Sequence, residues 1–181
     1  MRFATFAFSL VLAGCGSSTS PAPTPPAAPT PPAQPSGVKE ISFKAPAEWV
    51  VEKPSNAMRK AQYRVPDRNG RADAASLTLF SFGGPASTLE SNIEQWQGQM
   101  GGGEPDVKKI EGAASPTTVV DISGTYSADD QAKPLENARL LVGVVETSRG
   151  TWYFKLVGPA ATIDGWKIPY VDFLKGVRAV E

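Results

Sequence analysis

The sequence predicts an α+β domain in which an antiparallel β-sheet is flanked by helices on both faces, as an α/β/α sandwich. Short alternating apolar segments separated by turn residues favour neighbouring antiparallel strands. One segment, 140–145, is apolar on both faces, which indicates that layers cover the sheet on both sides. Two segments, 89–100 and 160–177, have apolar residues at helical spacing, one between the strands and one after them.

The first strands are predicted from short alternating stretches. Residues 41–43 alternate like a short strand, and Pro46 with Trp49 predicts a turn. Residues 59–65 alternate again, with their apolar side chains on one face, and Pro66 ends the stretch. The domain is therefore expected to open with strands rather than with a helix.

A hairpin turn is predicted between this stretch and the strand expected over 75–82. Asn69-Gly70 is a strong short hairpin signal. Asp67, Asn69 and Asp73 could instead supply oxygen ligands for calcium, but the acidic spacing and the closing glutamate of an EF-hand loop are missing. We therefore favour a plain turn at this position.

The most regular helical pattern follows Gly83-Gly84-Pro85. Ser87 and Glu90 have the spacing of a capping box, and the glycines at 101–103 predict the C-terminal end of the helix. One apolar stripe is expected to pack on the sheet, and it consists of Leu89, Ile93, Trp96 and Met100.

The second half of the domain returns to strands. Residues 118–126 and 152–157 are predicted strands, and Gly158-Pro159 is expected to end the latter. A helical stripe then covers 160–177. Pro169 lies inside this stretch, so we expect two short helices or a kink there.

The N-terminus is predicted to be a lipoprotein signal peptide over residues 1–14. A basic Arg2 precedes an apolar run that is too short for a membrane span, and Leu12-Ala13-Gly14-Cys15 forms a bacterial lipobox. Lipid on Cys15, as a diacylglyceryl group and an N-acyl chain, would supply the two signals that stable anchoring needs. An ordinary cleaved signal with a chance cysteine is the alternative.

Residues 15–37 are predicted to be the lipidated cysteine and a flexible linker, which leaves 38–181 as a single domain. The linker is built from Pro, Ala, Ser and Thr and has no large apolar side chain to bury, so it should stay extended. A passive spacer is the favoured interpretation, and Pro29-Thr30-Pro31-Pro32 as a ligand for a proline-binding partner is the alternative. Eight of the 17 prolines lie here, namely Pro21, Pro23, Pro25, Pro26, Pro29, Pro31, Pro32 and Pro35.

The composition argues against several function classes. The formal net charge is 0, which argues against a nucleic-acid partner. Histidine is absent and the lone cysteine is assigned to lipid, so we expect no catalytic residues, no metal site and no cofactor. An enzyme would need converging carboxylates, for which Asp129-Asp130 and Asp164 are the visible candidates, although the first pair reads as a solvated turn.

Five short segments are spread in order over the domain, namely Pro46-Ala47-Glu48-Trp49, Asn56-Ala57-Met58-Arg59-Lys60-Ala61, Asn92-Ile93-Glu94-Gln95-Trp96, Ser123-Gly124-Thr125-Tyr126 and Tyr153-Phe154-Lys155-Leu156-Val157-Gly158-Pro159. Together they resemble the PsbP-like α/β/α family and its lipid-anchored bacterial members. The resemblance implies an antiparallel sheet with helices on both sides and a binding or assembly role, since the family is generally non-enzymatic. It carries over no catalytic residues and no particular partner.

The expected function is therefore that of a lipid-anchored, non-catalytic binding or assembly protein of the bacterial cell envelope, with an envelope protein as its partner. In a bacterium with two membranes, the periplasmic face of the outer membrane is favoured, because Gly16 rather than Asp follows the cysteine. The alternative is a carrier of a small apolar or aromatic ligand, held between sheet and helix. The tryptophans that motivate this alternative are Trp49, Trp96, Trp152 and Trp166.

Replacing Cys15 with serine should move the protein from the membrane fraction to the soluble fraction without altering the fold of the domain, because the lipid is its predicted membrane attachment. Fractionation of cells followed by immunoblotting measures this directly. A Cys15→Ser variant that remains membrane-bound would contradict the lipid anchor.

Overall fold

The computed structural model describes residues 35, 38–70, 72–82, 88–128 and 133–180. The predictions for the leader, Cys15 and most of the linker lie outside these residues, as do Ser87, Asp129 and Asp130. Among the described residues, no helix combines the length and the apolar content needed to span a membrane. The elements are β1 (Ile41–Ser42), β2 (Val50–Glu52), β3 (Ala61–Val65), β4 (Ala75–Phe82), α1 (Leu89–Gln99), β5 (Pro105–Lys109), β6 (Thr117–Tyr126), β7 (Leu135–Thr147), β8 (Gly150–Pro159), α2 (Ala160–Lys175) and β9 (Arg178–Ala179).

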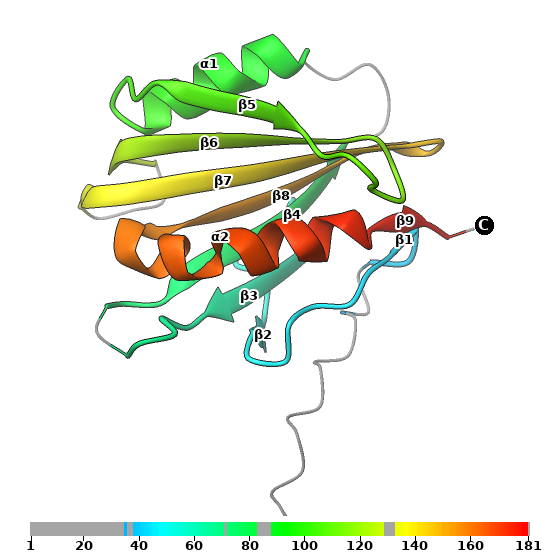
Figure 1. Cartoon of the computed structure of the whole chain (residues 1–181), viewed down its shortest axis with the longest axis horizontal. Coiled ribbons are helices and arrows are strands. Elements are labelled where there is room, and N and C mark those ends of the chain that lie inside the picture. Colours follow the sequence, from blue (N-terminus) through cyan, green and yellow to red (C-terminus); the bar gives the residue numbers. More distant parts are fainter. Residues whose placement is uncertain (1–34, 36–37, 71, 83–87, 129–132, 181) are drawn as a thin grey trace, which may run out of the picture.

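Seven of the strands form one antiparallel sheet in the order β2-β3-β4-β8-β7-β6-β5. The short strands β1 and β9 pair with each other in a separate sheet. Helix α2 lies across the face turned to the viewer in Figure 1, and α1 lies at the β5–β6 end of the sheet. The predicted antiparallel α+β architecture is confirmed.

Strand β7 contributes to two separate hydrophobic cores, one on each face of the sheet. Leu140, Val142 and Val144 belong to the core that contains the buried residues of α1. Leu141 and Val145, which alternate with them, belong to the core under α2. Because alternate residues of a strand point to opposite faces, the doubly apolar pattern in the sequence correctly indicated a strand that is covered on both sides.

The predicted turn after Pro66 is confirmed, although the hairpin loop is longer than a two-residue Asn-Gly turn. The paired strands close at Val65 and Ala75, and Gly70 has a φ of +64°. The backbone N–H of Gly70 donates to the Asp67 carbonyl at 3.2 Å. The Asp67 carboxylate accepts from the backbone N–H of Ala72, and no group of three acidic side chains suited to a metal is found in the described residues.

The N-cap of helix α1 is Thr88, one residue after the predicted Ser87, and the helix begins at Leu89. The Thr88 hydroxyl accepts from the backbone N–H of Ser91 at 3.2 Å, so Thr88 is the N-cap and the Ser87–Glu90 pairing is wrong. The glycine-rich end is confirmed. Gly101 has a φ of +68°, and the N–H of Gly102 donates to the Gln97 carbonyl at 2.8 Å, the long bond of a Schellman motif.

The C-terminal helix differs from the prediction in two ways. Strand β8 runs through Gly158 to Pro159, and Pro159, with a φ of −54° and a ψ of 135°, then serves as the N-cap of α2. Position 158 of the strand requires glycine, because a Cβ there would lie 2.6 Å from the Ala75 Cβ and a side chain would not fit between the strands. The helix then continues past Pro169 as one element instead of two.

The surroundings of Gly165 explain why α2 tolerates Pro169. A proline lacks the N–H that would bond the carbonyl four residues earlier, so the Gly165 carbonyl loses its helical partner. The Arg68 guanidinium donates to that oxygen at 3.5 Å and lies 5.0 Å from the centre of the Trp166 ring. The Trp166 indole N–H in turn donates to the Pro66 carbonyl at 2.6 Å, so the β3–β4 loop clamps this turn of the helix.

Helix α2 approaches the centre of the sheet through Gly143 and Tyr170. A Cβ at Gly143 would lie 2.5 Å from Cδ1 of Leu174, so a larger residue would push the helix away. The Tyr170 hydroxyl accepts from the Gly143 backbone N–H at 2.9 Å and donates to the carbonyl of Phe154, the residue opposite Gly143 in β8. Burial raises the pKa of this phenol well above its usual range, so the hydroxyl remains protonated and able to donate.

Replacing Tyr170 with phenylalanine should lower the free energy of unfolding by about 1–3 kcal/mol for each buried backbone group left unpaired, at Gly143 and Phe154. Urea unfolding followed by circular dichroism measures the loss. The matched control is Tyr153→Phe, whose hydroxyl accepts from Asn92 in a partly buried position and should cost less. Equal stability of Tyr170→Phe and the parent chain would contradict the bridging role.

Candidate functional site

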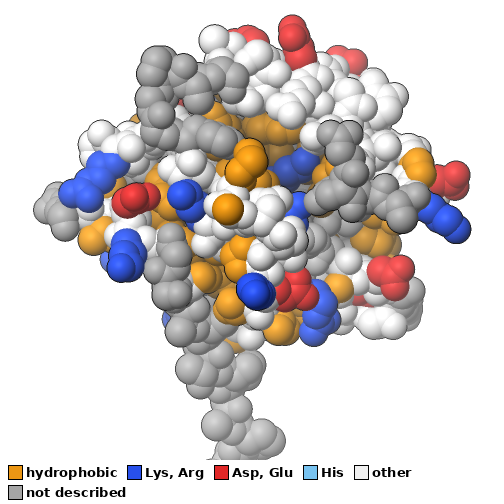
Figure 2. All heavy atoms as spheres, turned by 180° about the vertical axis from the view of Figure 1, so that it is seen from behind, with side chains coloured by type: hydrophobic (Ala, Val, Ile, Leu, Met, Phe, Trp, Pro, Cys, Tyr) orange, Lys and Arg blue, Asp and Glu red, His pale blue; other side chains and the backbone are white. Residues whose placement is uncertain are grey.

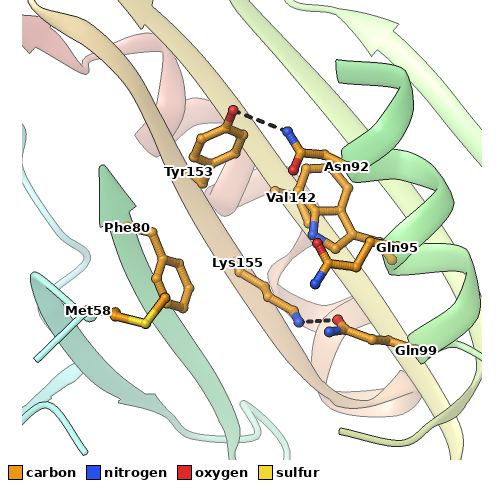
Figure 3. A pocket seen from close by; sticks show the side chains of 9 residues that line it. Met58, Phe80, Asn92, Gln95, Gln99, Val142, Tyr153 and Lys155 are labelled. Atoms are coloured by element: carbon orange, nitrogen blue, oxygen red, sulfur yellow. Dashed lines mark hydrogen bonds between the residues drawn. The ribbon is translucent and has the colours of Figure 1, made fainter. Parts of the chain in front are cut away.

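A groove of about 190 Å³ lies between α1 and β4, on the face of the sheet opposite to α2. Its floor comes from β7 and β8, one wall from α1, and the other wall from β4 and the turn before β3 (Figure 3). The described residues that line it are Met58, Phe80, Asn92, Gln95, Trp96, Gln99, Val142, Tyr153 and Lys155.

The wall contributed by α1 consists largely of side-chain amides. Asn92, Gln95 and Gln99 are three and four positions apart, which places them in a row along one side of the helix. Asn92 Nδ2 donates to the Tyr153 hydroxyl at 3.2 Å, and this bond joins the helix to the floor. Amides both donate and accept hydrogen bonds, so this wall can pair with either kind of polar group on a ligand.

Lys155 places a positive charge on the floor of the groove. Its ammonium group donates to Gln99 Oε1 and, at 3.3 Å, to the Tyr126 hydroxyl, and it lies 5.0 Å from the centre of the Tyr126 ring. Gln99, Lys155 and Tyr126 therefore form one connected polar network, and Asn92 pairs with Tyr153 beside it. This network holds the side chains of the floor in defined positions.

The opposite wall is apolar and partly open to solvent. Phe80 is half-buried, and Met58 is 62% exposed, the second largest exposure among the large hydrophobic residues of the described chain. Figure 2 views the molecule from this side, where hydrophobic side chains lie uncovered near the middle of the face with basic side chains between them. The groove thus combines an apolar wall with a hydrogen-bonding wall, as small ligand sites and peptide sites do.

Three of the four tryptophans proposed for ligand binding are core residues instead. Trp49, Trp152 and Trp166 are each 1% exposed and lie in the core under α2. Trp49 contacts Trp166 and Phe173 edge-to-face, with ring centroids 5.8 and 5.0 Å apart. Only Trp96, which packs against Tyr153, also lines the groove. The positions of the tryptophans in the sequence could not distinguish core packing from ligand binding, because both roles place the side chain between the sheet and a helix.

The candidate catalytic carboxylate Asp164 belongs to an ion-pair cluster that attaches α2 to the sheet. The Arg139 guanidinium holds both oxygens of Asp121 at 2.7 Å and also pairs with Asp164. Lys167 of α2 lies 2.7 Å from the same Asp121 carboxylate. Asp164 is therefore paired with the Arg139 guanidinium and does not form the pair of converging carboxylates that an enzyme would need. Asp129 and Asp130 lie outside the described residues.

The charge state of Asp121 follows from these contacts. Burial alone would raise the pKa of the Asp121 carboxyl, but the hydrogen bonds and charges of Arg139 and Lys167 outweigh it and hold that pKa below its usual range. The interaction with Asp121 also raises the pKa of Arg139. Asp121 and Arg139 therefore form an ionised pair at neutral pH, and the cluster stabilises the contact between α2 and strands β6 and β7.

Replacing Asp121 with asparagine should lower the free energy of unfolding by about 1–3 kcal/mol at pH 7, because two cations lose their buried partner. A depressed folded-state pKa gives stability that is present above the unfolded value, about 3.9, and is lost as the pH falls through the folded value. The difference between the two proteins in urea unfolding should therefore shrink below about pH 4. The control Asp164→Asn removes a carboxylate whose side chain is 56% exposed and should cost less. A difference that persists unchanged at acid pH would contradict this role of Asp121.

Comparison with known proteins identifies the fold but not a close relative. No protein-family model and no curated protein matches the sequence. Among solved structures, the chain is similar to the solution structure of cyanobacterial PsbP (CyanoP) from Synechocystis sp. PCC 6803, with a TM-score of 0.51 and 12% sequence identity. The match covers 84% of this chain and 100% of that one. The resemblance predicted from the sequence is thus confirmed at the level of the fold, and the chain has a PsbP-like α+β fold.

Proposed function

We propose that this protein is a lipid-anchored lipoprotein of the bacterial cell envelope whose domain binds a partner without catalysis. The lipobox ending at Cys15 supports the anchor, and the proline-rich linker supports a domain held at a distance from the membrane. The PsbP-like fold supports a binding or assembly role, as the resemblance implies. In a bacterium with two membranes, Gly16 after the cysteine favours the periplasmic face of the outer membrane.

The groove beside α1 is the surface on which this proposal depends. Met58 is largely exposed on its rim, and the amide row of α1 faces Met58 and Phe80 across the floor. Exposed apolar side chains next to ordered hydrogen-bonding groups are typical of a protein interface. Among the nine described lining residues, the titratable groups are Tyr153 and Lys155, and both are hydrogen-bonded to amides of α1. This lining is better suited to recognition than to acid–base chemistry.

A carrier of a small apolar or aromatic ligand is the second candidate function. The observation that favours it is the lining of Trp96, Tyr153, Phe80 and Met58. The volume of about 190 Å³ is below the ~300–1,000 Å³ of sites for drug-sized ligands, so only a small molecule would fit. A protein partner that covers the open rim would use the same surface, and the volume of the groove would not limit its size.

The test is an affinity isolation of the lipidated protein from its own envelope, with variants on opposite faces. Met58→Glu places a charge on the groove rim, and Ile168→Glu is the matched control because Ile168 is 76% exposed on α2. The proposal predicts a stoichiometric protein partner whose recovery falls about tenfold or more with Met58→Glu, as expected for an interface anchor. Recovery should not change with Ile168→Glu.

Mass spectrometry of both proteins and extracted small molecules separates the two candidates. A small molecule retained without a protein, and lost in Met58→Glu, would establish the carrier and overturn the assembly role. A partner recovered with Met58→Glu as fully as with Ile168→Glu and the parent chain would place the binding surface elsewhere.

A further inference from the structure

The proline-rich linker meets the domain beside the groove. Pro35 lies in a surface pocket of about 610 Å³ together with Asn56 and Ala57. The next residue, Met58, forms the rim of the groove, and adjacent Cα atoms are about 3.8 Å apart. The pocket that contains Pro35 and the groove are thus joined by one turn of chain. Pro35 therefore lies close to the rim of the groove.

The length of the segment Pro29-Thr30-Pro31-Pro32 is close to the length of the amide row. An extended proline-rich segment rises about 3.1 Å per residue, so Pro29–Pro32 lie within about 9–19 Å of Pro35 along the chain. Asn92 and Gln99 are seven positions apart on α1, or about 10 Å along the helix axis. The four residues from Pro29 to Pro32 span about 9 Å in a polyproline II conformation. One such turn therefore matches the length of the amide row.

The chemistry of the groove also matches this segment. Proline has no backbone N–H, so a polyproline II segment offers carbonyl acceptors and apolar rings rather than donors. Sites that bind such segments combine aromatic walls with side-chain donors. The groove provides Phe80 and Tyr153 for the rings, and Gln95 and Gln99 for the carbonyls. The linker carries no charge, so the docked segment brings no ion of its own into the groove.

We propose that Pro29-Thr30-Pro31-Pro32 docks in the groove of its own chain and is displaced when the partner binds. The proposal rests on the groove being the binding surface, as inferred above. Because the segment is tethered, its effective concentration at the groove is of the order of mM, so a weak intrinsic affinity suffices. Docking shortens the reach of the domain from the membrane and covers the rim of the groove until a partner competes for it.

The experiment is site-specific photocrosslinking in the full-length, lipidated protein in intact envelopes. The probe p-benzoylphenylalanine replaces Gln95, which is exposed and lines the groove. The matched control carries the probe in place of Glu94, which is exposed on the same helix but does not line the groove. Denaturing gel electrophoresis before peptide mapping separates links within one chain, which leave the mass of the protein unchanged, from links between copies, which double it.

The proposal predicts that the probe at position 95 links to peptides of residues 16–34 within one chain, and that the probe at 94 does not. Replacing Pro29, Pro31 and Pro32 with serine in the same protein should reduce that link to the level of the control position. A crosslinked product of twice the mass of the protein would assign the groove to a second copy and overturn docking within the chain. A link only to another envelope protein would overturn the docking but support the proposed function. The absence of any link at 95 would overturn both.

Discussion

The width of the sheet is the constraint on which the rest of this structure depends. Seven strands spaced about 4.8 Å apart make a sheet about 29 Å wide, whereas one helix with its side chains covers about 10 Å. Neither helix can therefore cover a face alone. On the α2 face the segment before β2 completes the cover, because Val38, Ile41, Ala45 and Trp49 all lie in that core. On the other face, α1 packs on β6, and the described residues leave the groove between α1 and β4.

The same constraint explains the composition of the central strands. Trp152, Phe154 and Leu156 of β8 point into the continuous core under α2, and all are nearly inaccessible to solvent. On the opposite face, β8 carries Tyr153 and Lys155, which need the amides of α1 as partners. A cation on the floor of a central strand is stable there because the floor remains open to water and to hydrogen-bonding side chains. The groove thus exists because α1 covers only part of this face of the sheet. The polar side chains on its floor are stabilised there by hydrogen bonds to the amides of α1.

The sequence predicted the parts of the fold that depend on burial. Three elements could be predicted in this way: strand β4, strand β7 with its two covered faces, and the C-terminal end of α1. Burial of a strand face produces a regular spacing of apolar residues in the sequence, and a helix end with a positive φ favours glycine. The strands β2 and β5 were not predicted. They lie at the two edges of the sheet, where Val50, Val51 and Val107 are partly exposed and no alternation is required. The course of β8 through Gly158 and the continuity of α2 past Pro169 depend on Ala75 and Arg68, which are distant in sequence.

A pocket between sheet and helix was predicted for the alternative carrier function, but of its lining only Trp96 was named, although β8 contains a usable signal. The apolar residues Trp152, Phe154 and Leu156 indicated the buried face of this strand. Lys155, on the opposite face, indicates that this face is not fully covered. The other lining residues come from α1, β4, β7 and the turn at Met58, and only the tertiary structure brings these together.

The central claim is that this groove is the working surface of the domain in the envelope. Hydroxyl-radical footprinting in intact envelopes tests it directly, with the modification of Met58 and Ile168 each normalised to the urea-unfolded chain. The account predicts that Met58, which is 62% exposed in the domain itself, is strongly protected, whereas Ile168 on α2 remains reactive. Modification of Met58 at the rate of the unfolded chain would show that nothing occupies the groove and would contradict the account.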